Sequence, residues 1–267
     1  MYESLEADSF SWAGSTYEEI KDVGERNGSV LIVPIGSVEQ HGHHLPVATD
    51  TILVEAVVSR MGEHLVENDN DVPFLVTPTI WTGYSPHHMD FGGSLTAPFR
   101  TLLAVLTNVI ESGLENGFES VLIVNGHGGN TPLIAAATSE VGADSPDQEI
   151  LSCTYFELAA SFVDDVRDSD VGGIAHAGEF ETSLMLHLRS DLVREERANV
   201  TYRDEPYAHA SREMFDSGPL SPYRSFAEMS GTGELGDPTL ATADKGEKLL
   251  ANLVAELATI VKAISDK

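Results

Sequence analysis

Residues 37–50 contain metal-type side chains at a spacing that could support chemistry. This segment, SVEQHGHHLPVATD, includes Glu39, His41 and Asp50. Glu39 and His41 point to the same side of an extended chain, because successive side chains alternate. Two carboxylates and an imidazole from one loop suit a divalent transition metal, and a bridging Asp50 would serve two ions. The alternative is that Asp50 only caps the helix that follows and that the histidines lie on the surface.

The glycine-rich segment 125–130, NGHGGN, follows an apolar run and precedes a helical pattern. It lacks the Lys-Ser/Thr pair of a phosphate-binding P-loop and is not a GxGxxG motif. Its glycines allow a sharp turn that would hold His127 at the edge of a sheet. A single histidine in such a turn is more often structural. Glu39, His41 and Asp50 are expected at the same edge of the sheet, and their proximity favours His127 as a metal ligand instead.

The third segment, residues 176–182 with the sequence HAGEFET, offers His176 and Glu181. Their spacing would not place them on one helix face if both were helical. They converge if His176 precedes a helix and Glu181 lies in its first turn. We interpret His176 as a general acid/base rather than a structural histidine. For Glu181, a role as metal ligand or proton-handling catalytic carboxylate competes with simple stabilisation of a helix N-terminus by negative charge.

Apolar runs that alternate with helical patterns must position these three segments. The predicted buried strands are 30–35, 74–76, 121–124 and 150–156, and the predicted helices are 51–67, 98–116, one from about 132, 179–188 and 240–264. This alternation predicts an α/β fold with a mostly parallel sheet covered on both faces. The active site of such a sheet lies at the carboxyl ends of the strands, where the three segments fall. We expect a single domain over residues 1–267, in which 199–238 is an irregular insertion.

The charge of the chain excludes two classes of partner. Its 267 residues include 15 Lys and Arg against 43 Asp and Glu, a net charge of −28. This charge would repel nucleic-acid phosphates and anionic membranes. The carboxylates are dispersed, which favours a solvated halophilic surface over a site for many ions or a cationic partner. With no signal-peptide pattern and no apolar run of membrane-span length, we expect a cytoplasmic protein.

Taken together, these segments resemble the creatininase (creatinine amidohydrolase) family. The matching motifs are EQHGxHLPxxTD at 39–50, NGH at 125–127, HAGExETS at 176–183 and, more weakly, GYSxxH at 83–88. The resemblance runs in order from about residue 30 to residue 190. It implies a three-layer α/β/α sandwich and a two-metal site that hydrolyses non-peptide C–N amide bonds of small molecules. It also implies a ring-like homo-oligomer, often a hexamer.

Carried over by position, the resemblance implies a role for each matching residue. Glu39, Asp50 and His127 would hold one metal ion, and His41 and Asp50 the other. A metal-activated water would attack the amide carbonyl, and His176 would pass a proton to the departing nitrogen. Carboxylate and imidazole ligands without thiolate suit Zn, Mn or Fe(II). The predicted substrate contacts are Tyr84, His88, Asn125 and Gly128.

Two departures from the family pattern argue against creatinine as the substrate. Gly129 stands where creatinine-hydrolysing members carry a glutamate ligand, so the second ion must take Glu181, water or substrate, or bind weakly. Those members are also expected to frame the substrate with tryptophans near the third motif, whereas the tryptophans here are Trp12 and Trp81.

The favoured function is therefore a metal-dependent amidohydrolase acting on a small-molecule amide, from a haloarchaeal member of the family. Three alternatives remain open at this point. The first is an archaeal formamide deformylase of flavin and deazaflavin biosynthesis. The second is a peptidase that trims a cofactor-precursor peptide. The third is a non-catalytic metal-binding scaffold, which the glycine at position 129 would favour.

Overall fold

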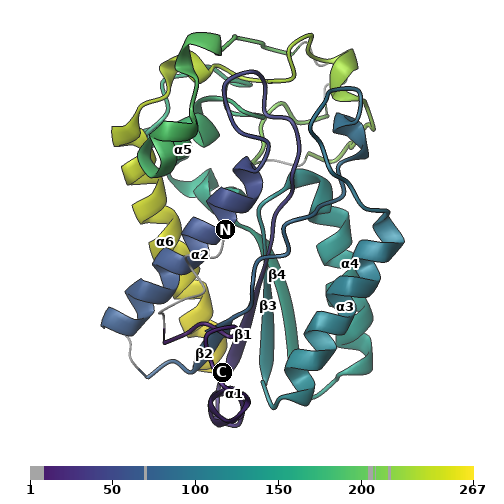
Figure 1. Ribbon diagram of the computed structural model, residues 1–267, viewed down its shortest axis with the longest axis vertical. Helices are drawn as coiled ribbons and strands as arrows, with labels where there is room; N and C mark the ends of the chain where they lie inside the picture. Colours follow the sequence, from purple (N-terminus) through teal and green to yellow (C-terminus); the bar gives the residue numbers. More distant parts are fainter. Residues whose placement is uncertain (1–8, 69–70, 204–206, 208, 216–217) are drawn as a thin grey trace.

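The computed structural model describes residues 9–68, 71–203, 207, 209–215 and 218–267. Within these residues the chain forms a three-layer α/β/α sandwich around a parallel four-stranded sheet of order β2-β1-β3-β4 (Figure 1). The strands are β1 (Val30–Ile35), β2 (Phe74–Val76), β3 (Ser120–Asn125) and β4 (Glu149–Thr154). The first two match the predicted bounds, β3 is one residue longer at each end, and β4 begins one residue earlier and ends two residues earlier than expected.

Helices cover both faces of the sheet, as the sequence predicts. One layer contains α2 (Thr49–Asn68), α5 (Glu179–Arg189) and α6 (Ala243–Ser265), and the other contains α3 (Phe99–Glu115) and α4 (Thr131–Asp144). The short helix α1 (Tyr17–Gly24) lies at the amino ends of the strands (Figure 1). The loops at the opposite, carboxyl edge are therefore the ones available to build a site.

The continuous apolar run of β1 is explained by helices on both sides. Val30 and Ile32 belong to the core cluster under α2, α5 and α6. Leu31 and Val33 belong to the cluster under α3 and α4. All four are at most 1% exposed. A strand buried on both faces carries apolar residues without alternation, which is why the run could be recognised.

The register of the central strands places two of the chemical segments side by side. β1 and β3 pair along their whole length, from Val30 opposite Ser120 to Ile35 opposite Asn125. The segments that follow Ile35 and Asn125 therefore leave the sheet at the same edge. One local prediction is wrong: Asp50 does not cap α2, because the helix already begins at Thr49.

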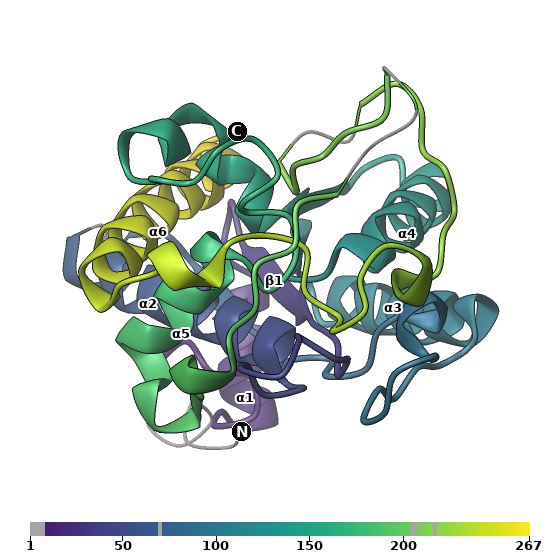
Figure 2. The same ribbon diagram turned by 90° about the horizontal axis from the view of Figure 1, so that it is seen from above.

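The described part of the segment 199–238 has no regular helix or strand and crosses above the carboxyl edge of the sheet (Figure 2). Its described part contains bends and a short 3₁₀ turn, Phe226–Glu228. An isolated bridge pairs Leu235 with His176, and a second bridge, between Thr201 and Gly236, joins the two ends of the segment. The insertion is thereby fixed directly against the third chemical segment.

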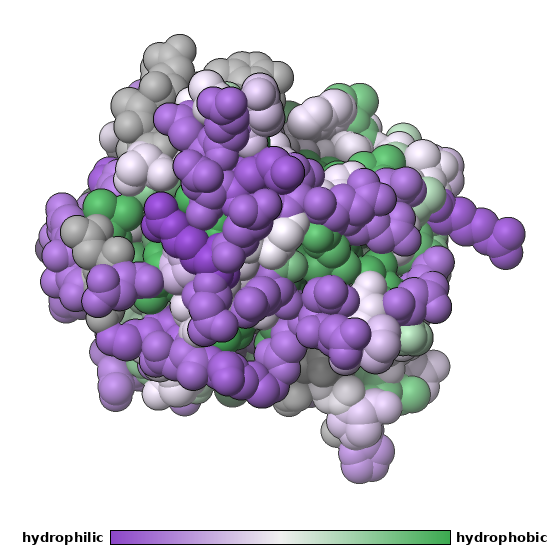
Figure 3. Space-filling model, turned by 90° about the horizontal axis from the view of Figure 1, so that it is seen from below, coloured by the Kyte–Doolittle hydropathy of each residue, from purple (hydrophilic) through white to green (hydrophobic). Residues whose placement is uncertain are grey.

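The opposite face of the molecule, at the amino ends of the strands, is covered mostly by hydrophilic side chains (Figure 3). Among the helices of the described residues, none combines the length and the apolar character needed to cross a bilayer.

Candidate metal centre

The loop after β1 folds back so that Glu39, His41 and Asp50 meet. The loop is closed by a hydrogen bond from the Glu39 N–H to the Val47 carbonyl at 2.8 Å. Gly42, with φ +65°, turns the chain in the left-handed region that glycine tolerates. The Nε2 of His41 lies 3.1 Å from Oδ1 of Asp50, and both side chains are buried. The two carboxylates and the imidazole that the sequence places in one loop therefore lie together in the structure.

A first triad is formed by Glu39, Asp50 and His127. The Nδ1 of His127 lies 3.2 Å from Oε1 of Glu39 and 3.3 Å from Oδ2 of Asp50. Gly126 makes this approach possible, because a Cβ there would come within 2.7 Å of the Val54 side chain and 2.9 Å of the Asp50 carbonyl. The turn after β3 therefore needs glycine to bring His127 against α2.

A second triad is formed by His41, Asp50 and Glu181. The Nε2 of His41 that faces Asp50 also lies 3.8 Å from Oε1 of Glu181. Glu181 lies in the first turn of α5 and His176 precedes that helix, which is the arrangement that lets the two converge. Asp50 is thus common to both triads, and the three candidate ligand atoms of each lie within 4.8 Å of one another.

The carboxylate of Glu181 is aimed by an unusual backbone conformation. Its Oε2 accepts a hydrogen bond of 2.5 Å from the N–H of Ala177. Ala177 has φ +51°, a left-handed conformation that is uncommon for a residue with a side chain. Such local strain is typical of functional sites, where the surrounding structure enforces it. Here the strained residue holds the second triad together.

Both triad histidines have their second ring nitrogen tied to a main-chain carbonyl. The Nδ1–H of His41 donates to the Glu39 carbonyl at 3.1 Å, which leaves Nε2 toward the triad. The Nε2 of His127 lies 3.2 Å from the Tyr84 carbonyl oxygen and 3.1 Å from the Ser85 hydroxyl. Its Nδ1 therefore faces the triad. Histidines that bind metal are typically oriented in this way.

The electrostatics of the triads are those of buried carboxylates and imidazoles that stabilise each other. Burial alone would raise the pKa of Glu39, but the charge of His127 and the hydrogen bonds that His127 and His88 donate to the carboxylate hold that pKa well below its usual range. Burial would lower the pKa of His41, but Asp50 raises it well above its usual range. Burial would also lower the pKa of His127, but the charge of Glu39 raises it to about 10. The metal-free site is therefore held together by protonated histidines.

The donor set fits divalent cations. Three carboxylates lie close together here, those of Glu39, Asp50 and Glu181, and each residue is at most 3% exposed. Buried anions of this kind require cationic partners. Oδ2 of Asp50 lies near His127 but receives no hydrogen bond of acceptable geometry from the described residues. Oxygen and imidazole ligands without thiolate suit Zn, Mn or Fe(II).

Glu179 and Glu181 lie in the same helical turn but differ in role. The Glu179 carboxylate accepts hydrogen bonds from the N–H groups of Asp168 and Ser169, both at 2.9 Å, and pairs with Lys245 of α6. Glu179 therefore fixes a loop against a helix. Glu181 alone of the two faces the metal triads.

His176 lies beside the triads without belonging to either. Its Nε2 is 2.9 Å from the Gln40 carbonyl and its Nδ1 is 4.0 Å from Oε1 of Glu39. Burial, and then the charge of His41, hold the pKa of His176 well below its usual range. A neutral imidazole in this place can accept a proton.

Of the four predicted substrate contacts, Gly128 is exposed, Tyr84 is half-buried, and Asn125 and His88 are buried. Gly128 is exposed, and no atom lies within 4 Å of where its Cβ would be. Asn125 is fully buried, and its amide holds the backbone on both sides of His127. The ring of Tyr84 packs edge-on against Phe99 at 5.4 Å.

The fourth, His88, is 1% exposed and contacts Glu39 through its Nε2 at 3.1 Å. Asn125 and His88 therefore hold other groups of the site in place. That the four residues contact substrate stays a prediction.

Several residues of the site were not singled out from the sequence. Ser37 and Ser85 are 2.7 Å apart, and they contact Glu39 and His127 respectively. Ser85 belongs to a quoted motif, which could have drawn attention to it. Phe226 stacks on His88 with ring centroids 4.0 Å apart, and it comes from the irregular insertion, where no sequence pattern marks it.

Gly129 leaves no room for a side chain. A Cβ there would collide with the ring of His127 and the carbonyl of Tyr84, and it would come within 2.8 Å of Cε1 of His87. A glutamate at this position would need a different arrangement of His87. In this chain the third carboxylate of the site comes from Glu181 instead.

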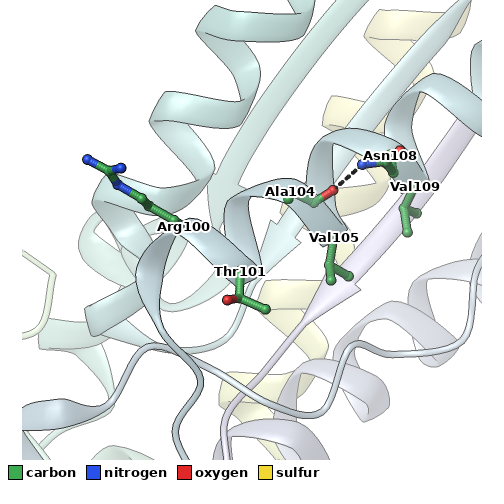
Figure 4. A pocket seen from close by; sticks show the side chains of 6 residues that line it. All are labelled: Arg100, Thr101, Ala104, Val105, Asn108 and Val109. Carbon is green, nitrogen blue, oxygen red and sulfur yellow. Dashed lines mark hydrogen bonds between the residues drawn. The ribbon is translucent and has the colours of Figure 1, made fainter.

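A hollow on the outward face of α3 is separate from the metal triads (Figure 4). It is lined by Arg100, Thr101, Ala104, Val105, Asn108 and Val109. None of these residues has a carboxylate or an imidazole, and the Asn108 amide is bonded to the Ala104 carbonyl at 2.5 Å. The hollow adds no ligand to the site.

Comparisons with known proteins agree with this fold. The family model Creatininase, described as creatinine amidohydrolase, matches residues 13–261. The chain is 33% identical over 234 residues to the mycofactocin precursor peptide peptidase of Mycolicibacterium smegmatis, covering 87% of this chain and 84% of the relative. It is 28% identical over 266 residues to creatinine amidohydrolase of Pseudomonas putida, covering 92% and 94%. A crystal structure of creatinine amidohydrolase (creatininase) superimposes with a TM-score of 0.79 at 26% identity, covering 96% and 97%.

The chain therefore belongs to the creatininase family, and this membership makes it a hydrolase.

Proposed function

We propose that this chain is a metal-dependent hydrolase that cleaves a C–N amide bond of a small molecule. The observation that carries the proposal is the pair of triads that share Asp50, with His176 beside them. Solved creatininases of 25% identity, one described as the Zn–Zn type and one as the Mn form, support divalent metal ions at such a site.

The residues of this chain divide the work between binding and proton transfer. Glu39, Asp50 and His127 would hold one ion, and His41, Asp50 and Glu181 the other. Divalent cations held there would supply Lewis-acid chemistry, which polarises an amide carbonyl and lowers the pKa of water.

His176 supplies the proton transfer that breaking a C–N bond needs. As a neutral imidazole whose Nδ1 points toward Glu39, it can take up a proton and pass it to the departing nitrogen. Phe226 packs against His176 in a T-shaped arrangement, with ring centroids 4.6 Å apart. The open space at Gly128 leaves room for substrate close to the backbone.

A second candidate substrate is a precursor peptide. The identity to the mycofactocin precursor peptide peptidase, 33%, exceeds the 28% identity to creatinine amidohydrolase. The closed position at Gly129 also separates this chain from the ligand pattern expected of creatinine-hydrolysing members. The formamide deformylase remains a narrower version of the small-molecule proposal. The presence of His176 beside the triads, together with Asp50 and Glu181, weighs against the non-catalytic scaffold, because a protein that only binds metal needs no group for proton transfer.

The test is a substrate panel assayed with the metal-loaded protein in molar KCl. The panel contains formamides, monitored by formate release, cyclic amides including creatinine, and short peptides. We expect turnover of a formamide or cyclic amide by the natural chain and by Glu67→Ala, an exposed position of α2. His176→Ala should lose the activity while keeping its metal. Turnover of peptides alone would replace the first candidate by the second, and no turnover of any class would contradict both.

The proposal has two further parts, a salt-rich cytoplasm inferred from the net charge and a homo-oligomer inferred from the family. A net charge of −28 suits a cytoplasm with molar salt, as in haloarchaea. Self-association into a homo-oligomer is implied by the family, and light scattering in molar KCl would measure it. A monomer at working concentrations would contradict this part without affecting the metal site.

A further inference from the structure

The side-chain amide of Gln40 connects the histidines of the site to the insertion. Its Nε2 donates to the Gly233 carbonyl at 2.9 Å and lies 2.8 Å from Nδ1 of His88. Its Oε1 accepts from the N–H of Gly42 at 2.9 Å. Gln40 is 5% exposed, so these partners are not exchanged for bulk water.

Two of these partners fix the orientation of the amide. The carbonyl of Gly233 can only accept a hydrogen bond, and the N–H of Gly42 can only donate one. If the amide of Gln40 were rotated by half a turn, an oxygen would face the Gly233 carbonyl and an NH₂ would face the Gly42 N–H. Both buried groups would then lose their partners, which is costly in a protein interior. The amide nitrogen must therefore face His88.

The fixed amide determines which nitrogen of His88 carries the hydrogen. An amide NH₂ has two hydrogens, and one is used by Gly233. The other is directed to Nδ1 of His88, which must present its lone pair to accept it. The hydrogen of a neutral His88 is then on Nε2, where Oε1 of Glu39 accepts it at 3.1 Å. Through His88, Gln40 thus orients a carboxylate of the first triad.

The main chain of the same residue sets the tautomer of His176. The Nε2 of His176 lies 2.9 Å from the carbonyl oxygen of Gln40, which can only accept. It also lies 3.3 Å from the Gln40 amide nitrogen, whose two hydrogens already have acceptors at shorter distance. The Nε2 of His176 therefore carries the hydrogen. Its Nδ1 keeps the lone pair and points toward Glu39 at 4.0 Å.

We propose that Gln40 is a positioning residue of the hydrolase proposed above and that Gly233 of the insertion holds it in place. Gln40 fixes His88 and His176 as Nε2–H tautomers, so that His88 donates to Glu39 and the Nδ1 of His176 is free to accept a proton. Gly233 has φ +99°, and a Cβ at this position would collide with Oε1 of Gln40. The insertion therefore supports Gln40 directly through Gly233.

Two variants test this proposal, and a third is their matched control. In Gly233→Ala the new methyl group displaces the Gln40 amide, and in Gln40→Glu the carboxylate cannot donate to His88. Gly231→Ala is the control, because Gly231 is exposed in the same turn and no atom lies within 4 Å of its Cβ position. Circular dichroism establishes that each variant is folded.

The direct readout is the ¹⁵N NMR spectrum of histidine in zinc-loaded protein, with signals assigned from His88→Asn and His176→Asn. We expect Nε2–H tautomers for both histidines in the natural chain and in Gly231→Ala. In Gly233→Ala and Gln40→Glu, His88 should gain a hydrogen at Nδ1. With an active substrate, kcat should fall roughly 10- to 100-fold in these two variants while KM changes little, as for other groups that orient metal ligands.

The proposal is overturned if His88 of the natural chain carries its hydrogen on Nδ1. It is also overturned if folded Gly233→Ala and Gln40→Glu show the same tautomers as the natural chain. The NMR readout does not depend on turnover. A chain that shows the expected tautomers and hydrolyses no amide would therefore contradict the proposed function and leave the positioning role of Gln40 intact.

Discussion

The two triads share Asp50, but they are built by different parts of the fold. In the first, Glu39 and His127 follow neighbouring strands whose ends are in register, and His127 lies 3.2 Å and 3.3 Å from its two carboxylate partners. In the second, Glu181 comes from a helix and lies 3.8 Å from His41, held by the N–H of the strained Ala177. The sheet itself defines one triad, whereas the other depends on how α5 is docked. We therefore expect the second ion to bind more weakly.

Removing the shared ligand should have the largest effect. Asp50→Ala takes a carboxylate from both triads, so kcat/KM should fall roughly a thousandfold or more, the size expected when several kcal/mol of transition-state stabilisation are lost. Steady-state kinetics on the active substrate would measure this. Glu67→Ala, exposed on the same helix, should retain full activity. An Asp50→Ala protein that folds and retains most of its activity would show that the triads are not the active centre.

Removing the unshared ligands separates the triads. His127→Ala and Glu181→Ala should each lose one ion per chain and keep the other, because each substitution leaves all three ligands of the other triad in place. Metal analysis after dialysis against a weak chelator would measure this. Glu179→Ala is the control for Glu181, since it lies in the same turn but binds a loop and Lys245. It should keep both ions and lower Tm. If it lost metal and Glu181→Ala did not, the assignment of the two glutamates would be reversed.

The first triad could be predicted from the sequence because its determinants are local. The apolar runs of β1 and β3 mark strands buried on both faces, and the residues after parallel neighbouring strands must meet at one edge. Gly126 and His127 belong to a short motif that follows directly. The position of Asp50 inside α2 rather than at its cap was missed, because helix boundaries are set by main-chain geometry that composition does not resolve.

The rest of the site depends on contacts between segments distant in the sequence. Glu181 could be read equally well as a ligand or as a helix-terminal charge, and only the docking of α5 decides. Gln40 meets Gly233, and Phe226 covers His88, across more than a hundred residues. The insertion that supplies these residues has no periodicity, so no pattern could indicate which of its side chains would face the site.

Metal binding should release protons. Asp50 and Glu39 raise the pKa values of His41 and His127, respectively, in the metal-free chain, so both imidazoles are protonated at neutral pH. These protons stabilise the metal-free fold at neutral pH, and for His127 that contribution is lost as the pH rises through about 10. A metal ion needs the neutral imidazole. Apparent affinity should therefore increase with pH, by up to about tenfold per pH unit for each proton displaced.

Calorimetric titration with zinc in buffers of different ionisation enthalpy would measure the protons released. We expect a value between one and two at neutral pH in the natural chain. In His127→Ala the value should fall, since only His41 remains to lose a proton. Identical heats in all buffers would mean that the histidines are neutral before the ion binds, and the electrostatic account of the triads would be wrong.

Salt should have the smallest of these effects. With a net charge of −28, carboxylate repulsion in dilute buffer opposes folding and is screened in molar KCl. Each kcal/mol gained should raise Tm by about 2–4 °C for a chain of this size class. Thermal unfolding in dilute and molar KCl, with sucrose as a control for osmotic effects, would measure the shift. A Tm that falls with KCl would contradict the halophilic interpretation of the surface.

The most direct test of the two-triad account is the metal content of the natural chain. Protein purified and dialysed in molar KCl would be analysed by mass spectrometry for Zn, Mn and Fe, together with Asp50→Ala as the metal-free reference. The account predicts two divalent ions per chain, with Glu181 supplying the carboxylate that position 129 cannot. One ion or none in the natural chain would show that the second triad is not a metal site.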